Sequence, residues 1–181
     1  MSVQKQFGQL VGMLVQNLPE DLTPAQMQAW IGNPKGLQVG LRFLVQHVII
    51  DCDADPFLPQ GWKVESHKKM GQFEWDATKV ALYLDEGQQG GKCIEGNKLR
   101  KKLEAKNVHN ANVLDYLLAH PELIPEEWKG KAVFFWGTVY RNSAGGLYVR
   151  YLYWDGKRWD WYCLWLDSSW GGNSPAACSQ V

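Results

Sequence analysis

The stretch AVFFWGTVYRNSAGGLYVRYLYWDGKRWDWYCLWL (Ala132–Leu166) decides the fold. It contains three runs, 132–141, 147–154 and 158–166, that are rich in the aromatic and β-branched residues that strands prefer. Residues 142–146 form a first turn. Asp155-Gly156 forms a second, since Asp-Gly is a strong hairpin signal. The stretch therefore predicts a three-stranded antiparallel meander.

The turns also predict which side chains share a face of this sheet. A two-residue loop at Asp155-Gly156 places Leu152 opposite Trp159 and Arg150 opposite Trp161, and the first turn pairs Arg141 with Leu147. Because side chains alternate along a strand, one face then carries Phe134, Trp136, Tyr140, Tyr148, Arg150, Leu152, Trp154, Trp159, Trp161 and Trp165. The other face carries Val133, Phe135, Val139, Leu147, Val149, Tyr151, Tyr153, Tyr162, Leu164 and Leu166. A shift of one residue in either turn would exchange the faces of a whole strand.

The aliphatic face is the natural one to pack against helices, which leaves the aromatic face with two open interpretations. It is either a core covered by the N-terminal helices, or an exposed surface on which Arg150 makes cation–π contacts. The second interpretation predicts a non-catalytic binding or protein-interaction module, whose partner is a protein or a small polar or aromatic ligand. The ligand-binding residues would be Trp136, Tyr148, Arg150, Trp159 and Trp161.

The first fifty residues predict a helical region. Apolar residues between Val3 and Leu18 recur at helical spacing, and Pro19 ends that helix. Thr23-Pro24-Ala25-Gln26 begins a second helix with a capping box, and it runs to about Ile31. Asn33-Pro34 begins a third. Residues 51–61, acidic and with two prolines, are interpreted as a linker to a domain at 62–181.

Within residues 62–131 the pattern is mixed. Residues 72–84 predict a strand or two, and helices are expected near 96–106 and 110–119. The tail after Trp170 is expected to be loosely ordered. The predicted fold class is therefore α+β: a helical N-terminal region, then a mixed segment and a C-terminal three-stranded antiparallel aromatic-rich meander.

An alternative function uses Asp51, Asp53 and Asp55, which follow an apolar run. Three alternate carboxylates can hold a divalent cation, and an apolar run before Asp-x-Asp resembles metal-dependent sugar-nucleotide transferases. An EF-hand loop is excluded, because its sixth and twelfth positions would be Pro56 and Trp62. HExxH, GxSxG and phosphate-binding glycine motifs are missing, so no catalytic residue and no cofactor is predicted.

Charge and composition narrow the classes of partner. With 19 basic and 19 acidic residues the net charge is zero, so no overall field recruits nucleic acid or a membrane surface. Single-stranded nucleic acid binding remains a further alternative, through Lys98, Arg100, Lys101, Lys102, Lys106, Arg141, Arg150 and Arg158. No apolar stretch approaches the ~20 residues of a membrane helix. With no signal-peptide pattern at the start and no CxxC pair, we expect a cytoplasmic protein with free thiols.

Four segments support a resemblance. The sequences NANVLDYLL (110–118) and HPELIPEEWKG (120–130), with FFWGTVYR (134–141) and YVR (148–150), resemble a family of small uncharacterised proteins common in candidate-phylum bacterial genomes. The resemblance runs from about Asp55 to Ala177. It implies a bacterial protein, and it carries no assigned activity or site residues.

Overall fold

The computed structural model describes residues 11–13, 16, 23–33 and 49–180. The chain divides into two compact units, residues 1–47 and residues 48–181. In the first unit the helix α2 (Pro24–Ile31) confirms the predicted capping box: the Thr23 amide donates to Gln26 Oε1 over 2.8 Å, and the Gln26 amide donates to Thr23 Oγ1 over 3.3 Å. The other two predicted N-terminal helices lie largely or wholly outside the described residues.

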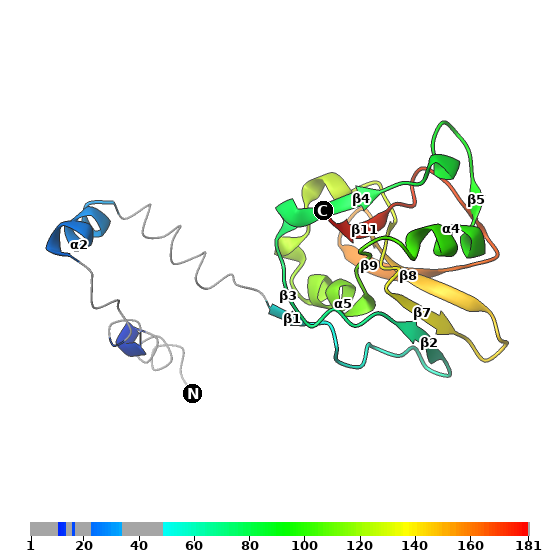
Figure 1. Ribbon diagram of the computed structural model, residues 1–181, viewed down its shortest axis with the longest axis horizontal. Coiled ribbons are helices and arrows are strands. Elements are labelled where there is room, and N and C mark those ends of the chain that lie inside the picture. Colours follow the sequence, from blue (N-terminus) through cyan, green and yellow to red (C-terminus); the bar gives the residue numbers. More distant parts are fainter. Residues whose placement is uncertain (1–10, 14–15, 17–22, 34–48, 181) are drawn as a thin grey trace. The chain divides into compact units, whose positions relative to one another are not determined.

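The second unit is built mostly of β-structure, and Figure 1 shows two short helices among its strands. The helices are α4 (Gly96–Leu103) and α5 (Ala111–Ala119), and four 3-10 turns lie at 77–79, 86–88, 121–123 and 126–128. The strands are β1 (Ile49–Asp51), β2 (Lys63–His67), β3 (Gln72–Glu74), β4 (Val80–Tyr83), β5 (Ile94–Glu95), β6 (Val133–Phe134), β7 (Thr138–Arg141), β8 (Leu147–Trp154), β9 (Trp159–Trp165), β10 (Ser169–Trp170) and β11 (Ala176–Ser179).

The predicted α+β fold, a helical region followed by a mixed segment and a three-stranded meander, is wrong. Seven strands form one mixed sheet in the order β2-β7-β8-β6-β11-β4, with β9 paired to β8, and β1-β3 and β5-β10 form two small pairs. The tail after Trp170, expected to be loosely ordered, supplies the buried strand β11, which pairs parallel with β6 and antiparallel with β4. β3 and β4 lie in the range 72–84, where a strand or two was predicted. The strands β1, β2, β5, β10 and β11 have two to five residues, too few for an alternating pattern to show in the sequence.

The meander itself forms, with one register as predicted and one shifted. Arg141 pairs with Leu147, as expected from the first turn. At the second turn Leu152 pairs with Trp161 instead of Trp159, because the loop has four residues, 155–158. The Asp155 carboxylate accepts hydrogen bonds from the Lys157 and Arg158 amides over 2.7 and 2.8 Å, which closes this longer loop. A shift of two residues leaves every side chain of β9 on its expected face.

The first strand is different, because a turn at Phe135–Gly137 divides it into β6 and β7. The Gly137 amide donates to the His109 carbonyl over 2.8 Å, and Val133 instead of Phe134 lies on the face of Leu152. Phe134 and Trp136 were therefore assigned to the wrong face. They pack with Val139 and Val149.

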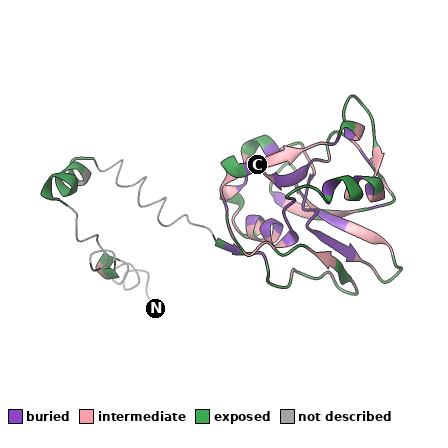
Figure 2. Ribbon diagram, viewed as in Figure 1, coloured by how far each residue is buried: buried purple, intermediate pink, exposed green. Residues whose placement is uncertain are grey.

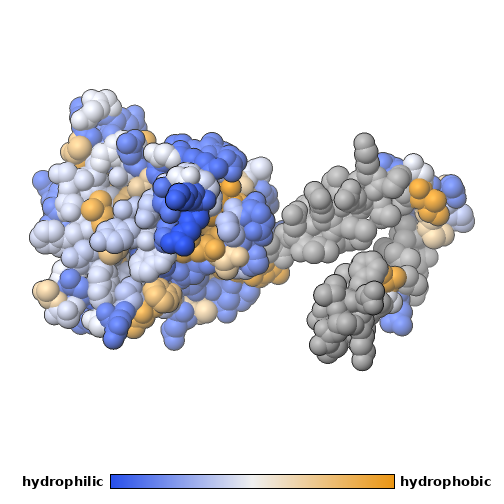
Figure 3. Space-filling model, turned by 180° about the vertical axis from the view of Figure 1, so that it is seen from behind, coloured by the Kyte–Doolittle hydropathy of each residue, from blue (hydrophilic) through white to orange (hydrophobic). Residues whose placement is uncertain are grey.

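Each face of the sheet covers its own apolar core. On one side Val113, Leu114 and Leu117 of α5 pack with Leu152 and Trp159. On the other side Leu99 and Leu103 of α4 pack with apolar side chains that include Phe134, Trp136 and Trp170. Figure 2 shows the resulting buried residues along β7, β8 and the inner side of both helices. The space-filling view from behind shows mainly hydrophilic residues on that face of the unit, with hydrophobic residues in small separate areas (Figure 3).

Candidate functional site

An open cleft of about 520 Å3 lies on the α5 side of the sheet, and we name it the Arg150 cleft. Strand β1, the loop that follows it, helix α5 and strands β8 and β9 all contribute to its walls. The lining residues are Ile49, Ile50, Asp51, Asp55, Phe57, Asn112, Asp115, Tyr116, Leu118, Arg150 and Trp161. Three of them are acids and one is a cation, so the cleft carries an excess of negative charge at neutral pH.

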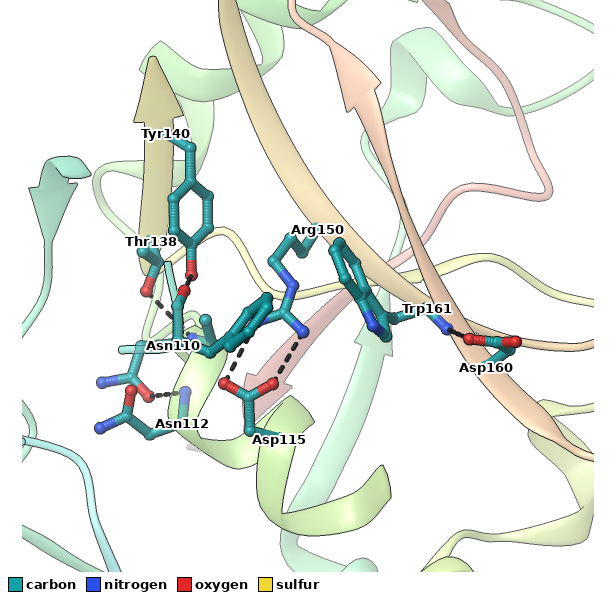
Figure 4. Close-up of polar contacts among 10 residues, drawn as sticks. Asn110, Asn112, Asp115, Thr138, Tyr140, Arg150, Asp160 and Trp161 are labelled. Carbon is teal, nitrogen blue, oxygen red and sulfur yellow. Dashed lines mark hydrogen bonds and ion pairs between the residues drawn. The ribbon is translucent and has the colours of Figure 1, made fainter. Parts of the chain in front are cut away.

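Arg150 is the central residue of this cleft. Alternation along β8 turns its side chain to the face of Leu152, where only 1% of it remains exposed. Its two terminal nitrogens donate to the two carboxylate oxygens of Asp115 on α5, over 2.7 and 3.1 Å (Figure 4). A buried cation is costly unless it is paired and hydrogen-bonded, and the planar fork of arginine fits a carboxylate with two parallel bonds. This pair therefore ties the centre of the sheet to α5.

Two aromatic rings cover the guanidinium group. Its central carbon lies 4.1 Å from the ring centroid of Trp161 and 5.0 Å from that of Phe57. The two rings meet edge to face at 5.7 Å. Tyr140 holds the Phe57 loop in place, since its hydroxyl donates to the Phe57 carbonyl over 3.1 Å. Arg150 is thus fixed by two cation–π contacts as well as by its ion pair.

The three aspartates of the metal hypothesis do not act as one group in the described part of the chain. Asp51 Oδ1 accepts from the amides of Asp53 and Ala54, and Asp53 Oδ1 accepts from those of Met70 and Gly71. These carboxylates therefore shape the loop after β1. Among the described residues no group of three His, Cys, Asp or Glu side chains is arranged to hold a metal ion. A further ligand such as His47, which precedes these aspartates in the sequence, would lie outside the described residues.

A buried polar network beside the cleft was not predicted. His67 Nδ1 lies 2.8 Å from Thr138 Oγ1, and its Nε2 lies 3.1 Å from the Cys52 carbonyl, which also accepts from Asn110 Nδ2 over 2.8 Å. Asn110 also caps α5 by accepting from the Asn112 amide, as its place before the helix predicts. The partners are 15 to 71 residues apart in sequence, so only the cap had a local signal.

Two buried groups of the same region are electrostatically inert at neutral pH. Burial, followed by the charge of Lys68, lowers the pKa of His109 to about 4, and neither of its ring nitrogens has a hydrogen-bond partner in the structure. Burial, followed by the nearby charges of Asp51 and Asp53, raises the pKa of Cys52 to about 11. His109 is thus neutral but a weak base, because its pKa lies far below 7. Cys52 is a thiol and not the thiolate that binds metals or attacks substrates.

The five ligand-binding residues expected from the sequence do not form one surface. Arg150 and Trp161 meet at the cleft. Trp159 is buried in the α5-side core and Trp136 in the α4-side core. Tyr148 is half-buried and packs on Trp62, with ring centroids 4.7 Å apart. Asp115 and Phe57, which complete the site, were missed. The sequence places Asp115 inside a predicted helix and Phe57 inside the predicted linker.

Four of the eight cations of the nucleic acid hypothesis are matched by carboxylates. Arg141 contacts Glu65 at 2.7 Å, Lys102 contacts Asp85 at 2.8 Å, and Arg158 contacts Asp160 at 3.1 Å. Arg150 is buried against Asp115. Lys98 and Lys101 are exposed on α4. The ion pairs of the four matched cations reduce the positive charge that a phosphate backbone would meet.

Comparison with protein-family models, with curated proteins and with solved structures finds no match for this chain. None of the helices in the described residues is long and apolar enough to cross a membrane.

Proposed function

We propose that the unit at residues 48–181 is a non-catalytic binding module, whose Arg150 cleft receives a positively charged, hydrogen-bond-donating group of a partner protein. The observation that carries this proposal is the balance of donors and acceptors in the cleft. Its polar groups that remain available are mainly acceptors, and its charge is negative.

The donors at the cleft are largely occupied. The terminal nitrogens of Arg150 bind Asp115. Asn112 Nδ2 donates to the carbonyls of Asp51 and Ala54, over 2.8 and 2.9 Å. Arg150 Nε is buried with its residue and has no partner. The Trp161 indole N–H and the Tyr116 hydroxyl are the uncharged side-chain donors that also line the cleft. A ligand that brings acceptors, such as a carboxylate, would therefore meet carboxylates of its own sign.

The acceptors are more available. Asn112 Oδ1 has no hydrogen-bond partner, although it is shielded from solvent in the structure. Asp115 keeps 31% of its side chain exposed beside its bonds to Arg150, and Asp55 is exposed at the rim. An ammonium or guanidinium group supplies three to five donors and no acceptor, which matches this set. A buried acceptor without a partner, such as Asn112 Oδ1, destabilises the free protein, and a ligand that donates to it removes that cost.

The aromatic residues favour the same class of ligand. Trp161, Phe57 and Tyr116 line the cleft, and Phe57 is half-exposed. Ring faces attract cations, and the contact strengthens where water is partly excluded. The fixed position of Trp161, held against Arg150, reduces the entropy that ligand binding would cost.

The proposal is tested by titration of 15N-labelled protein with three blocked amino acids: N-acetyl-arginine methylamide, N-acetyl-lysine methylamide and N-acetyl-glutamate methylamide. We expect the two cationic probes to shift the Trp161 indole resonance and the glutamate probe to leave it in place. Trp161→Phe should weaken binding about five-fold, since a cation–π contact contributes about 1 kcal/mol.

Trp165→Phe is the matched control, because Trp165 lies on the same strand, is 44% exposed and does not line the cleft. It should leave binding unchanged. Equal binding of all three probes, or equal weakening by both variants, would contradict the proposal.

A further inference from the structure

A second pocket lies on the other side of β7, with a volume of about 300 Å3, and we name it the basic pocket. It shares no lining residue with the Arg150 cleft. Its walls come from the end of β2, from α4 and the segment after it, and from the turn between β6 and β7. The lining residues are Ser66, His67, Lys68, Arg100, Leu103, Glu104, Lys106, Val108, Trp136, Gly137 and Val139.

The charge of the basic pocket is positive. Lys68, Arg100 and Lys106 line it, against the single carboxylate of Glu104. The Lys106 ammonium lies over the Tyr83 ring, 4.6 Å from its centroid. Its charge is therefore close to the pocket but partly engaged by that ring. Lys68 and Arg100 are therefore the two cations whose charge is most available in the pocket.

Both cations keep unused donors. Lys68 Nζ donates to the Lys106 carbonyl over 3.0 Å, which uses one of its three N–H groups. Arg100 Nη2 donates to Ser66 Oγ over 3.2 Å, which uses one of its five. Since Ser66 Oγ accepts in that bond, its own hydrogen is free to donate. None of these bonds pairs either cation with a carboxylate.

Trp136 contributes an independent observation. Only 5% of this residue is exposed, and its indole nitrogen is buried without a hydrogen-bond partner. Its ring is fixed in the α4-side core against Trp170, with centroids 4.6 Å apart. A buried N–H that nothing accepts is disfavoured in a folded protein, because it has lost its hydrogen bond to water. Here it belongs to a residue that lines a positively charged pocket.

We propose that the basic pocket binds a phosphate group, either as inorganic phosphate or on a small phosphorylated molecule. A phosphate carries between one and two negative charges at neutral pH and has three or more strong acceptor oxygens. Arg100 and Lys68 supply charge-assisted donors, which form the stronger class of hydrogen bond. Ser66 and the Trp136 indole supply neutral donors. A phosphate oxygen that reaches the indole N–H would also pair a donor that the fold alone leaves without a partner.

The test follows the Trp136 indole proton by NMR, during titration of the full chain with sodium phosphate at constant ionic strength. The resonance is assigned by its loss in Trp136→Phe. We expect a saturable downfield shift that sodium chloride does not produce. Arg100→Gln should weaken the apparent affinity by about five-fold or more, since an arginine–phosphate contact is charge-assisted.

Lys101→Gln is the matched control, because it removes the same charge from the neighbouring position of α4 and does not line the pocket. It should leave the affinity within about two-fold, as expected for a screened exposed charge. Lys68→Gln is the second variant. Lys68 is exposed, so its replacement tests the pocket with little effect on the stability of the fold.

Several results would overturn the proposal. One is an indole resonance that stays in place up to about 50 mM phosphate, a concentration that detects even weak millimolar binding. Another is equal weakening by Arg100→Gln and Lys101→Gln, which would show a general effect of surface charge. A third is binding of an oligonucleotide or a phosphopeptide at this surface without any response to inorganic phosphate. A response to inorganic phosphate and to a small phosphate ester with the same variant profile supports the proposal.

Discussion

Acid should destabilise this protein through His109 before it protonates most carboxylates. The ring of His109 is fully buried, lies 4.7 Å from the ring of Phe73 and has no hydrogen-bond partner in the structure. Burial, with a smaller contribution from the charge of Lys68, lowers its pKa from 6.5 to about 4. The folded protein therefore keeps His109 neutral at a pH where the unfolded chain binds a proton.

The sign and the size of the effect follow from this difference in pKa. Because the unfolded state binds more protons between pH 6.5 and about 4, the free energy of unfolding falls as the pH falls through that window. Well above pH 6.5, His109 is neutral in both the folded and the unfolded state, so it does not change the free energy of unfolding there. Each unit of pKa difference corresponds to about 1.4 kcal/mol, so His109 should remove about 2.5 kcal/mol of stability between pH 7.5 and 4.5.

The assay is urea denaturation followed by tryptophan fluorescence at pH 7.5, 6.5, 5.5 and 4.5, for the wild type and for His109→Phe. The phenyl ring fills a similar volume and cannot be protonated. Carboxylates whose pKa is lowered in the folded state, such as Asp85, contribute equally to both proteins, so the difference between them isolates His109. If the two proteins lose the same free energy between pH 7.5 and 4.5, the reasoning is refuted.

Three further predictions concern the ion pair of Arg150, the close contact between Gly137 and Asn110, and the thiol of Cys93. Asp115→Ala leaves the buried Arg150 without its countercharge and should reduce the free energy of unfolding by about 3 kcal/mol; a urea midpoint equal to that of the wild type would argue against a buried pair. Gly137→Ala places a methyl group 2.8 Å from Asn110 Cα and should cost about 1–3 kcal/mol, measured in the same way; no loss would show that the two loops can separate freely. Cys93 is exposed, so Ellman's reagent should modify it first in the folded protein, while two buried thiols, whose pKa burial raises to about 11, react only on unfolding. Cys93→Ser should abolish the fast phase, and a fast phase that persists would place another thiol at the surface.

The sequence predicted those elements whose signals are local. The capping box of α2 and the turn that pairs Arg141 with Leu147 each depend on residues within a few positions of one another. The faces of β8 and β9 were also predicted, because a four-residue loop in place of a two-residue loop preserves the alternation. Arg150 and Trp161 were therefore placed on one face from the sequence, and the two side chains are in contact in the structure.

The overall fold could not be predicted in the same way, because its sheet is completed by distant strands. β2 joins β7 across about seventy residues, and the tail returns as β11 between β6 and β4. Strands this short gain their stability from the neighbours they meet in the folded sheet, so they leave little pattern in their own residues. The prediction of a loose tail was wrong for this reason.

The sheet face on which Trp136 lies could not be predicted either, although Trp136 belongs to a single run of strand-forming residues. Nothing local to FFWGTV marks a break, yet Gly137 is held by the His109 carbonyl and closely approached by Asn110. That contact turns the chain, and Phe134 and Trp136 exchange faces as a result. A glycine permits such an approach because it has no Cβ, but only the position of the facing loop requires it.

The sequence by itself determined the hairpin pairing of β7, β8 and β9, the capping box of α2 and the shared face of Arg150 and Trp161. Hydrogen bonds between near neighbours and the two-residue period of a strand depend on adjacent positions. Only the tertiary structure decided that Asp115 and Phe57 enclose Arg150, that Trp136 and Trp159 are core residues, and that two pockets of opposite charge lie on the two sides of the sheet. Those properties depend on which segments, distant in the sequence, pack against one another. Packing sets the burial of each side chain and the charges near it, and the order of residues along the chain does not show it.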